Sequence, residues 1–208
     1  MTTKTPRSSI AARLMAGALC AASLAACAPL MVGSAVTGAM VATDRRSSGA
    51  QLDDQGIELR AANRLQDKLG NRARVSVTSY NRRVLLTGEV ASEAVKAEAE
   101  AVVKDMSNVE VVFNELAIAN SPTLRDRASD SLVTARVKGG LVEIKEISAN
   151  SFKVVTENNT VYLMGRVTQK ESEMATEVAR TSKGVERVVR VMEILTPEEL
   201  ARLPLARK

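Results

Sequence analysis

Histidine and tryptophan are absent from the 208 residues, and cysteine occurs only at Cys20 and Cys27. The lack of histidine excludes Cys/His zinc sites and nucleophile pairs that depend on histidine. Two tyrosines and two phenylalanines are too few for a base-stacking surface that binds nucleic acid. Nothing in the composition marks out a catalytic group, so we expect neither an enzyme nor a cofactor or metal.

The first 26 residues have the order of a secretory signal. They contain three basic residues, no acidic residue and an apolar run over 14–22, which is too short to span a bilayer. The ending Leu24-Ala25-Ala26-Cys27 resembles the lipobox of bacterial lipoproteins. This resemblance implies cleavage before Cys27 and lipid attachment to it, and hence a body tethered to a membrane. The alternative is a soluble secreted protein with a chance cysteine.

The basicity of the whole chain belongs largely to this leader. Removal of residues 1–26 takes away three of the 29 basic residues and none of the 24 acidic ones, which leaves a net charge of +2. A charge this small gives no general reason to bind nucleic acid. No thiol remains beyond Cys27, so no disulfide can form within the mature body.

One unit is written twice in the mature chain. The stretch 75–107 aligns with 152–184, and the matched pairs include Asn81 with Asn158 and Gly88 with Gly165. We therefore predict two small domains, 52–120 and 121–195. A lipidated N-terminus and spacer over 27–51 precede them, and a tail over 196–208 follows.

Each copy is predicted to run α-β-β-α-β, an α+β fold. The expected helices cover 52–69 and 130–147, and Asn81-Arg82 and Asn158-Asn159 suit tight turns between the first two strands because asparagine tolerates positive φ. The closing strands are expected over 109–118 and 185–195. Two helices on one face of a three-stranded mixed sheet is the simplest arrangement that buries both apolar stripes.

The starts and ends of the helices carry weaker signals. Thr168 and Glu171 have capping-box spacing before the second helix of the second copy. The first copy has Ala91 and Ala94 at these positions, so its helix is expected to start with less help. Its apolar stripe is expected to include Val102. Gly139-Gly140 lower helix propensity, so the first helix of the second copy could break there.

Gly88 and Gly165 fall where the second strand meets the second helix of each copy. The structural interpretation is a backbone angle or close packing that excludes a side chain. The functional interpretation is a ligand-facing loop. Neither glycine belongs to a GxGxxG or P-loop pattern.

The α-β-β-α-β repeat, its mid-module glycine and the closing Val-Glu-x-Val pattern at 109–112 and 185–188 resemble the BON domain. The runs 42–51 and 153–158 resemble the dual-BON lipoproteins of the DolP/YraP family. This resemblance implies a non-enzymatic, periplasm-facing protein anchored in the outer membrane, with a role in envelope integrity and cell division. It also implies binding of anionic phospholipid through the second domain and a link to the machinery that assembles outer-membrane β-barrels.

The family resemblance places the lipid contact on the first helix of the second domain. Here Leu132, Arg136 and Lys138 lie outside the stripe expected to enter the core, and Val142 follows. An exposed apolar residue beside cations suits an anionic membrane interface. Leu132 stands where the family often has tryptophan, so contact is expected to be weaker or shifted towards Val142. The alternative is an ordinary solvated helix.

Two further alternatives stay open from the sequence. The first is that the paired domains scaffold envelope assembly proteins without recognising lipid. A third possible function, an enzyme that uses carboxylates, is the least favoured. The second concerns the apolar, uncharged segment 28–42, which is either a spacer or a segment at the interface.

Overall fold

The computed structural model describes residues 44–119 and 123–203, except for the side chain of Leu124. The signal, Cys27 and the segment 28–42 lie outside the described residues. Everything described belongs to one compact unit that begins at Ala42.

The first domain has the predicted α-β-β-α-β order, with its last strand in two pieces. Its helices and strands are α3 (Ser48–Leu69), β1 (Ala73–Tyr80), β2 (Arg83–Val90), α4 (Glu93–Lys104), β3 (Val111–Asn114) and β4 (Ala117–Ile118), with a 3-10 turn over Gly70–Arg72. β2 pairs antiparallel with β1 and parallel with β3 and β4.

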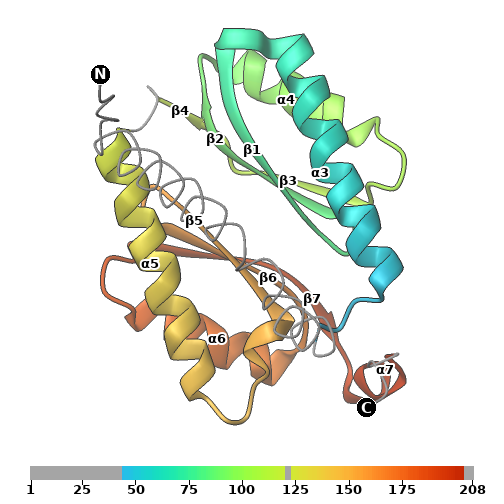
Figure 1. Ribbon diagram of the computed structural model, residues 1–208, viewed down its shortest axis with the longest axis vertical. Helices are drawn as coiled ribbons and strands as arrows, with labels where there is room; N and C mark the ends of the chain where they lie inside the picture. Colours follow the sequence, from blue (N-terminus) through green and yellow to red (C-terminus); the bar gives the residue numbers. More distant parts are fainter. Residues whose placement is uncertain (1–43, 120–122, 204–208) are drawn as a thin grey trace, which may run out of the picture. The chain divides into compact units, whose positions relative to one another are not determined.

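The second domain repeats this order and adds a short helix. Its elements are α5 (Leu124–Glu143), β5 (Phe152–Glu157), β6 (Thr160–Thr168), α6 (Gln169–Thr181), β7 (Arg187–Leu195) and α7 (Pro197–Arg202), with a 3-10 turn over Ala149–Ser151. β6 is the central strand, antiparallel to β5 and parallel to β7. The α+β prediction, with two helices on one face of each mixed sheet, is confirmed (Figure 1).

The two central strands are buried on both faces. In β2, Val84 and Leu86 belong to the core under α3 and α4, whereas Leu85 faces the other way. In β6, Val161 and Leu163 likewise lie in the core under α5 and α6. The side chains on the opposite faces form one shared apolar cluster of Tyr80, Leu85, Tyr162, Met164 and Val191. The two domains therefore pack through the sheet faces that their helices leave uncovered.

Polar contacts accompany this apolar cluster between the domains. Lys153 Nζ lies 2.7 Å from Glu58 Oε1, and Arg187 lies 2.8 Å from Glu115. Arg74 pairs with Glu157 across the same boundary. These contacts hold the second domain, and with it α5, against the first.

The tight turns between paired strands form as predicted. Asn81 and Arg82 have φ of 51° and 62°, and Asn158 and Asn159 have φ of 48° and 56°. These left-handed angles match the twist of the flanking strands. The turns fix the registers of β1 on β2 and of β5 on β6.

The helix boundaries correct the prediction for α5 and confirm the one for α4. α5 begins at Leu124 rather than Asp130, because Thr123 and Asp126 form a capping box there. It continues through Gly139-Gly140 without a break and ends at Glu143, before the predicted end near 147. α4 has a single cap from Ser92, whose side chain accepts from Val95 N, whereas α6 has a full capping box, so α4 starts with less help as predicted.

Three other details of the structure differ from the predictions. Val103 completes the fully buried stripe of α4, because it lies eight residues after Val95, and the predicted Val102 packs partly buried against the same core. The last strand of the first domain is interrupted where the Asn114 side chain accepts from Leu116 N, and Leu116 turns into the core. The segment after the last strand begins with the short helix α7, which Thr196 caps.

Candidate functional site

One face of α5 is fixed to the second domain. Val133, Val137 and Leu141 are almost completely buried in its core. Asp130, 7% exposed, accepts hydrogen bonds of 2.9 Å from the backbone N–H groups of Asn158 and Asn159. These contacts turn the opposite face of the helix towards solvent.

The solvent face of α5 carries an uncharged stripe. Its members recur at alternating intervals of four and three residues and are all exposed: Ala128, Leu132, Ala135, Gly139 and Val142. Residues at this spacing share one side of a helix. Leu132 is 58% exposed and Val142 is 71% exposed, so two large apolar side chains stand free on this side.

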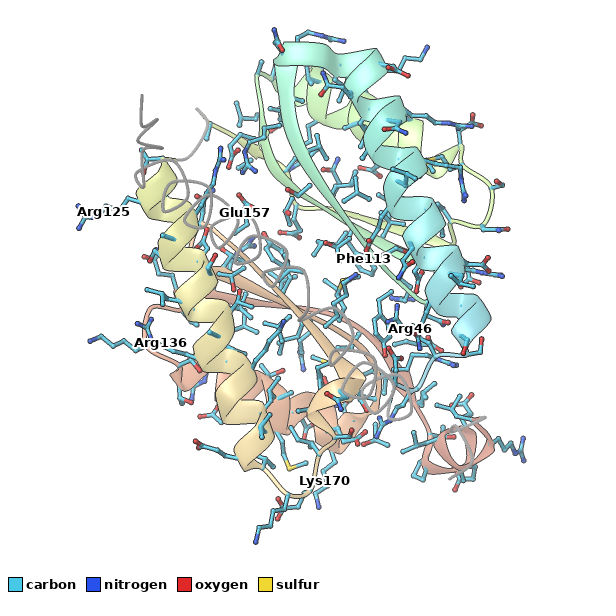
Figure 2. The ribbon with its side chains drawn as sticks, viewed as in Figure 1. Arg46, Phe113, Arg125, Arg136, Glu157 and Lys170 are labelled. Carbon is cyan, nitrogen blue, oxygen red and sulfur yellow. The ribbon has the colours of Figure 1, made fainter. Side chains whose placement is uncertain are left out.

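Cations border the stripe on both sides. Arg127 and Lys138 lie along one flank. Arg125 and Arg136 lie along the other flank, together with the acidic residue Glu143. Figure 2 shows Arg125 and Arg136 pointing away from the sheet side of the helix. The face therefore combines an apolar centre with a basic margin.

The turn after α6 lies beside the cations of α5. Arg136 Nη1 donates to the carbonyl oxygen of Lys183 at 3.2 Å, which brings the turn after α6 beside α5. A Cβ at Gly184 would lie 3.0 Å from Val133 and 3.6 Å from Arg136 Nη1, so the turn is close-fitting. The exposed Lys183 adds a further cation to this side.

The four residues predicted for the lipid contact lie on one exposed helix. Leu132 and Val142 belong to the uncharged stripe, while Arg136 and Lys138 lie on opposite flanks of it. Arg125 and Arg127 were not predicted, because the sequence pattern indicates a helix that begins only at Asp130. The Thr123–Asp126 capping box was the signal that would have included them. Lys183 had no sequence signal, because only the tertiary fold places it near Arg136.

The two predicted glycines lie in close-packed backbone. Gly88 has φ of +117°, and a Cβ there would lie 2.0 Å from the carbonyl oxygen of Arg74. A Cβ at Gly165 would lie 2.5 Å from the carbonyl oxygen of Ser151. Both contacts are too short for any side chain, which favours the structural interpretation over the ligand-facing loop.

The first domain has a cavity of about 420 Å³ beside the end of α3. Its lining includes Arg74 and Glu89, whose side chains pair with each other at 2.6 Å. Within the described residues, no group of His, Cys, Asp or Glu could hold a metal ion. In the same part of the chain, no helix is long and apolar enough to cross a membrane.

A family model for the BON domain matches residues 53–120 and 129–196. The chain belongs to the BON family. It is 34% identical over 174 residues to the outer membrane lipoprotein DolP of Haemophilus influenzae, covering 83% of this chain and 90% of that protein. A 21 kDa hemolysin of Actinobacillus pleuropneumoniae is 32% identical, covering 72% of this chain and 78% of its own length. The osmotically inducible protein Y of Escherichia coli is 28% identical over 73% of this chain and 77% of its own length.

These comparisons confirm the family inferred from the sequence. The chain is a dual-BON protein of the DolP/YraP type, similar over most of its length to an outer membrane lipoprotein. α5 is thus the first helix of its second BON domain. Attachment through Cys27 lies outside the described residues and stays a prediction.

Proposed function

We propose that this protein recognises anionic phospholipid through the outer face of α5 and thereby helps to maintain the outer membrane. The observation that supports the proposal is the uncharged stripe with exposed Leu132 and Val142 between two rows of cations. A helix of this kind lies in the plane of a membrane interface, with its apolar side at the acyl boundary and its cations at the phosphates.

The two parts of the face contribute by different means. A cation close to an anionic surface contributes about 1 kcal/mol. The four on the flanks of α5, offset in part by Glu143, therefore supply an attraction of the same order as the burial of Leu132 and Val142. Burial of a leucine side chain contributes about 2 kcal/mol at most, and Leu132 lacks the interfacial preference of an indole. We therefore expect binding that depends strongly on salt and on anionic lipid.

Lipidation of Cys27 supplements this contact in the proposal. A single weak signal gives only reversible membrane binding, whereas an acyl anchor combined with a basic face gives stable attachment. The anchor would keep the protein at the membrane, and α5 would select the anionic lipid. The segment 28–42 would serve as the spacer between them.

The test uses the full mature chain with Cys27→Ala, which removes the attachment point. Binding is measured by flotation with vesicles of phosphatidylglycerol and phosphatidylcholine, and with phosphatidylcholine alone. We expect binding to the first only, and at least a tenfold loss with Leu132→Glu. Leu52→Glu is the matched control, because Leu52 is also an exposed leucine, at 68% against 58% for Leu132, on the other long helix. If Leu132→Glu binds the vesicles as well as the parent chain does, α5 is not the lipid-binding helix.

A second candidate function is a scaffold for envelope assembly proteins, including the machinery that assembles outer-membrane β-barrels. It is favoured by α3, where Leu52 and Leu59 lie seven residues apart and are 68% and 65% exposed. The helix surface between and beside them is uncharged at Gln55 and Ala62, and the Arg60 guanidinium lies over Gly56. A surface depleted of charge and carrying large apolar side chains is typical of the centre of a protein interface.

The two functions are separated in cells that carry the variant in place of the native protein. If lipid recognition maintains the membrane, Leu132→Glu raises outer-membrane permeability to a large antibiotic and Leu52→Glu does not. The reverse result, together with intact vesicle binding by both variants, would favour the scaffold.

A further inference from the structure

The segment that leads into α3 contacts both domains through two neighbouring arginines. Arg45 is 8% exposed, and its guanidinium donates to both carboxylate oxygens of Glu171, at 2.9 and 2.6 Å. It donates a third hydrogen bond, of 2.8 Å, to the carbonyl oxygen of Arg166. Glu171 lies in the first turn of α6, so Arg45 binds the second domain although it precedes the first in the sequence.

Arg46 binds the first domain instead. Its guanidinium donates to Asp54 Oδ2 at 2.8 Å and lies 4.1 Å from the centre of the Tyr80 ring. Asp44 holds the same guanidinium from the other side, with Nη2 at 2.7 Å from Oδ2. Tyr80 belongs to the apolar cluster that both sheets share. Consecutive residues thus hold opposite domains at the edge of their interface.

We propose that Glu171 and the Arg166 carbonyl form a guanidinium-binding site on the second domain whose ligand is this chain's own Arg45. The occupied site makes Asp44–Arg46 a clasp that keeps the two BON domains closed on each other. A planar guanidinium that meets both oxygens of a carboxylate is the strong, directional form of ion pair, and lysine cannot reproduce it.

Burial distinguishes this pair from the other ion pairs between the domains. The side chains of Arg45 and Glu171 are 9% and 10% exposed. Those of Lys153 and Glu58 are 37% and 30% exposed. Exposed pairs contribute little to stability, whereas loss of one partner from a buried pair leaves an uncompensated charge. The clasp is therefore the polar contact whose loss we expect to loosen the interface most.

The clasp also determines where a load on the anchor would be applied. Asp44 comes 17 residues after Cys27, so a pull on a lipidated N-terminus would reach the clasp before α3. The proposal does not depend on lipid recognition by α5, and its test contains no lipid.

The experiment measures the distance between the domains in the full mature chain with Cys27→Ala. Spin labels are placed on Asn63→Cys in α3 and Glu173→Cys in α6, both exposed positions, and the distance distribution is recorded by double electron–electron resonance. For the parent chain we expect one narrow distance distribution. With Arg45→Ala or Glu171→Gln, this distribution should be at least twofold broader. Glutamine at this position can keep the capping box with Thr168, so α6 should stay intact.

Three comparisons make the result specific. The double variant Arg45→Ala/Glu171→Gln is expected to be no broader than either single variant, because both remove one interaction. Arg180→Ala on the same helix breaks an ion pair whose partners are 68% and 58% exposed, and it should leave the distribution narrow. Ethylguanidinium should narrow the distribution of Arg45→Ala, whereas ethylammonium should not.

Two results would overturn the proposal. One is a distribution of Arg45→Ala that equals that of the parent chain. The other is broadening by the two single variants that adds up in the double variant. If Arg45→Ala fails to fold by circular dichroism, Arg45→Lys takes its place. Lysine keeps the positive charge but cannot donate the paired hydrogen bonds to both oxygens of Glu171. A distance distribution of Arg45→Lys as narrow as that of the parent chain would therefore also reject the clasp.

Discussion

Asp54 and Asp130 make the same contact in the two BON domains. Asp54 accepts from the backbone N–H groups of Asn81 and Arg82 at 2.7 and 2.9 Å. Asp130 accepts from those of Asn158 and Asn159, both at 2.9 Å. In each domain the first helix thus carries a carboxylate that fastens the turn between the first two strands.

This relationship predicts a stability loss in the second domain. Asp130→Ala leaves two N–H groups of the β5–β6 turn without their acceptor, and we expect a loss of about 1–3 kcal/mol in the free energy of unfolding. Urea denaturation followed by circular dichroism measures it. Asp126→Ala is the control on the same helix. Asp126 caps only the exposed start of α5, so its loss should be smaller. Equal losses would contradict the role of Asp130.

Stability is expected to fall in acid through Asp54 and Glu171. Burial raises the pKa of Asp54, but hydrogen bonds from Ser79, Arg82 and Arg46 outweigh it and hold the pKa below its usual value. Burial also raises the pKa of Glu171, and the hydrogen bonds from Arg45 and Thr168 reverse the shift.

The sign of this pH dependence follows from the lowered pKa values. A carboxylate with a lower pKa in the folded state contributes fully above its unfolded-state pKa, about 3.9 for Asp and about 4.3 for Glu, and this contribution is lost as the pH falls through the folded value. The urea midpoint should therefore decline below about pH 4. Asp54→Asn and Glu171→Gln should each flatten the decline, and curves parallel to the parent would refute the assignment.

The glycines predict a second loss of stability. Gly88→Ala and Gly165→Ala push a Cβ against backbone carbonyl oxygens, so the strands must shift, and we expect each to destabilise the protein by about 2–4 kcal/mol. Gly139→Ala is the matched control, because a Cβ there meets nothing within 4 Å. Alanine should stabilise α5 at that position by up to about 1 kcal/mol. Thermal unfolding of the three variants measures the difference.

The fold could be predicted from the sequence, because the signals for its turns and helices are local and occur in both domains. Asn81 and Asn158 marked the turns, and the apolar stripes marked the helix faces. The candidate site was predictable in part, since Leu132 and Val142 fall outside the buried stripe of their own helix. Lys183 reaches this face only through the turn after α6. The bond from Arg45 to Glu171 joins residues 126 positions apart, and no periodicity in a single chain indicates such a contact.

The cations of α5 predict the salt dependence of membrane binding. Arg127 and Lys138 lie on the same flank, and at about 1 kcal/mol each their replacement by glutamine should weaken binding to phosphatidylglycerol vesicles by about 30-fold at low salt. The matched control is Arg64→Gln/Lys68→Gln, which removes an exposed arginine and lysine from α3 at the same cost in net charge. If long-range attraction alone held the protein, both double variants would lose affinity equally. If α5 is the contact, the control keeps most of its affinity, and only the α5 variant shows a shallower fall in binding between low and physiological salt, because Arg125 and Arg136 remain.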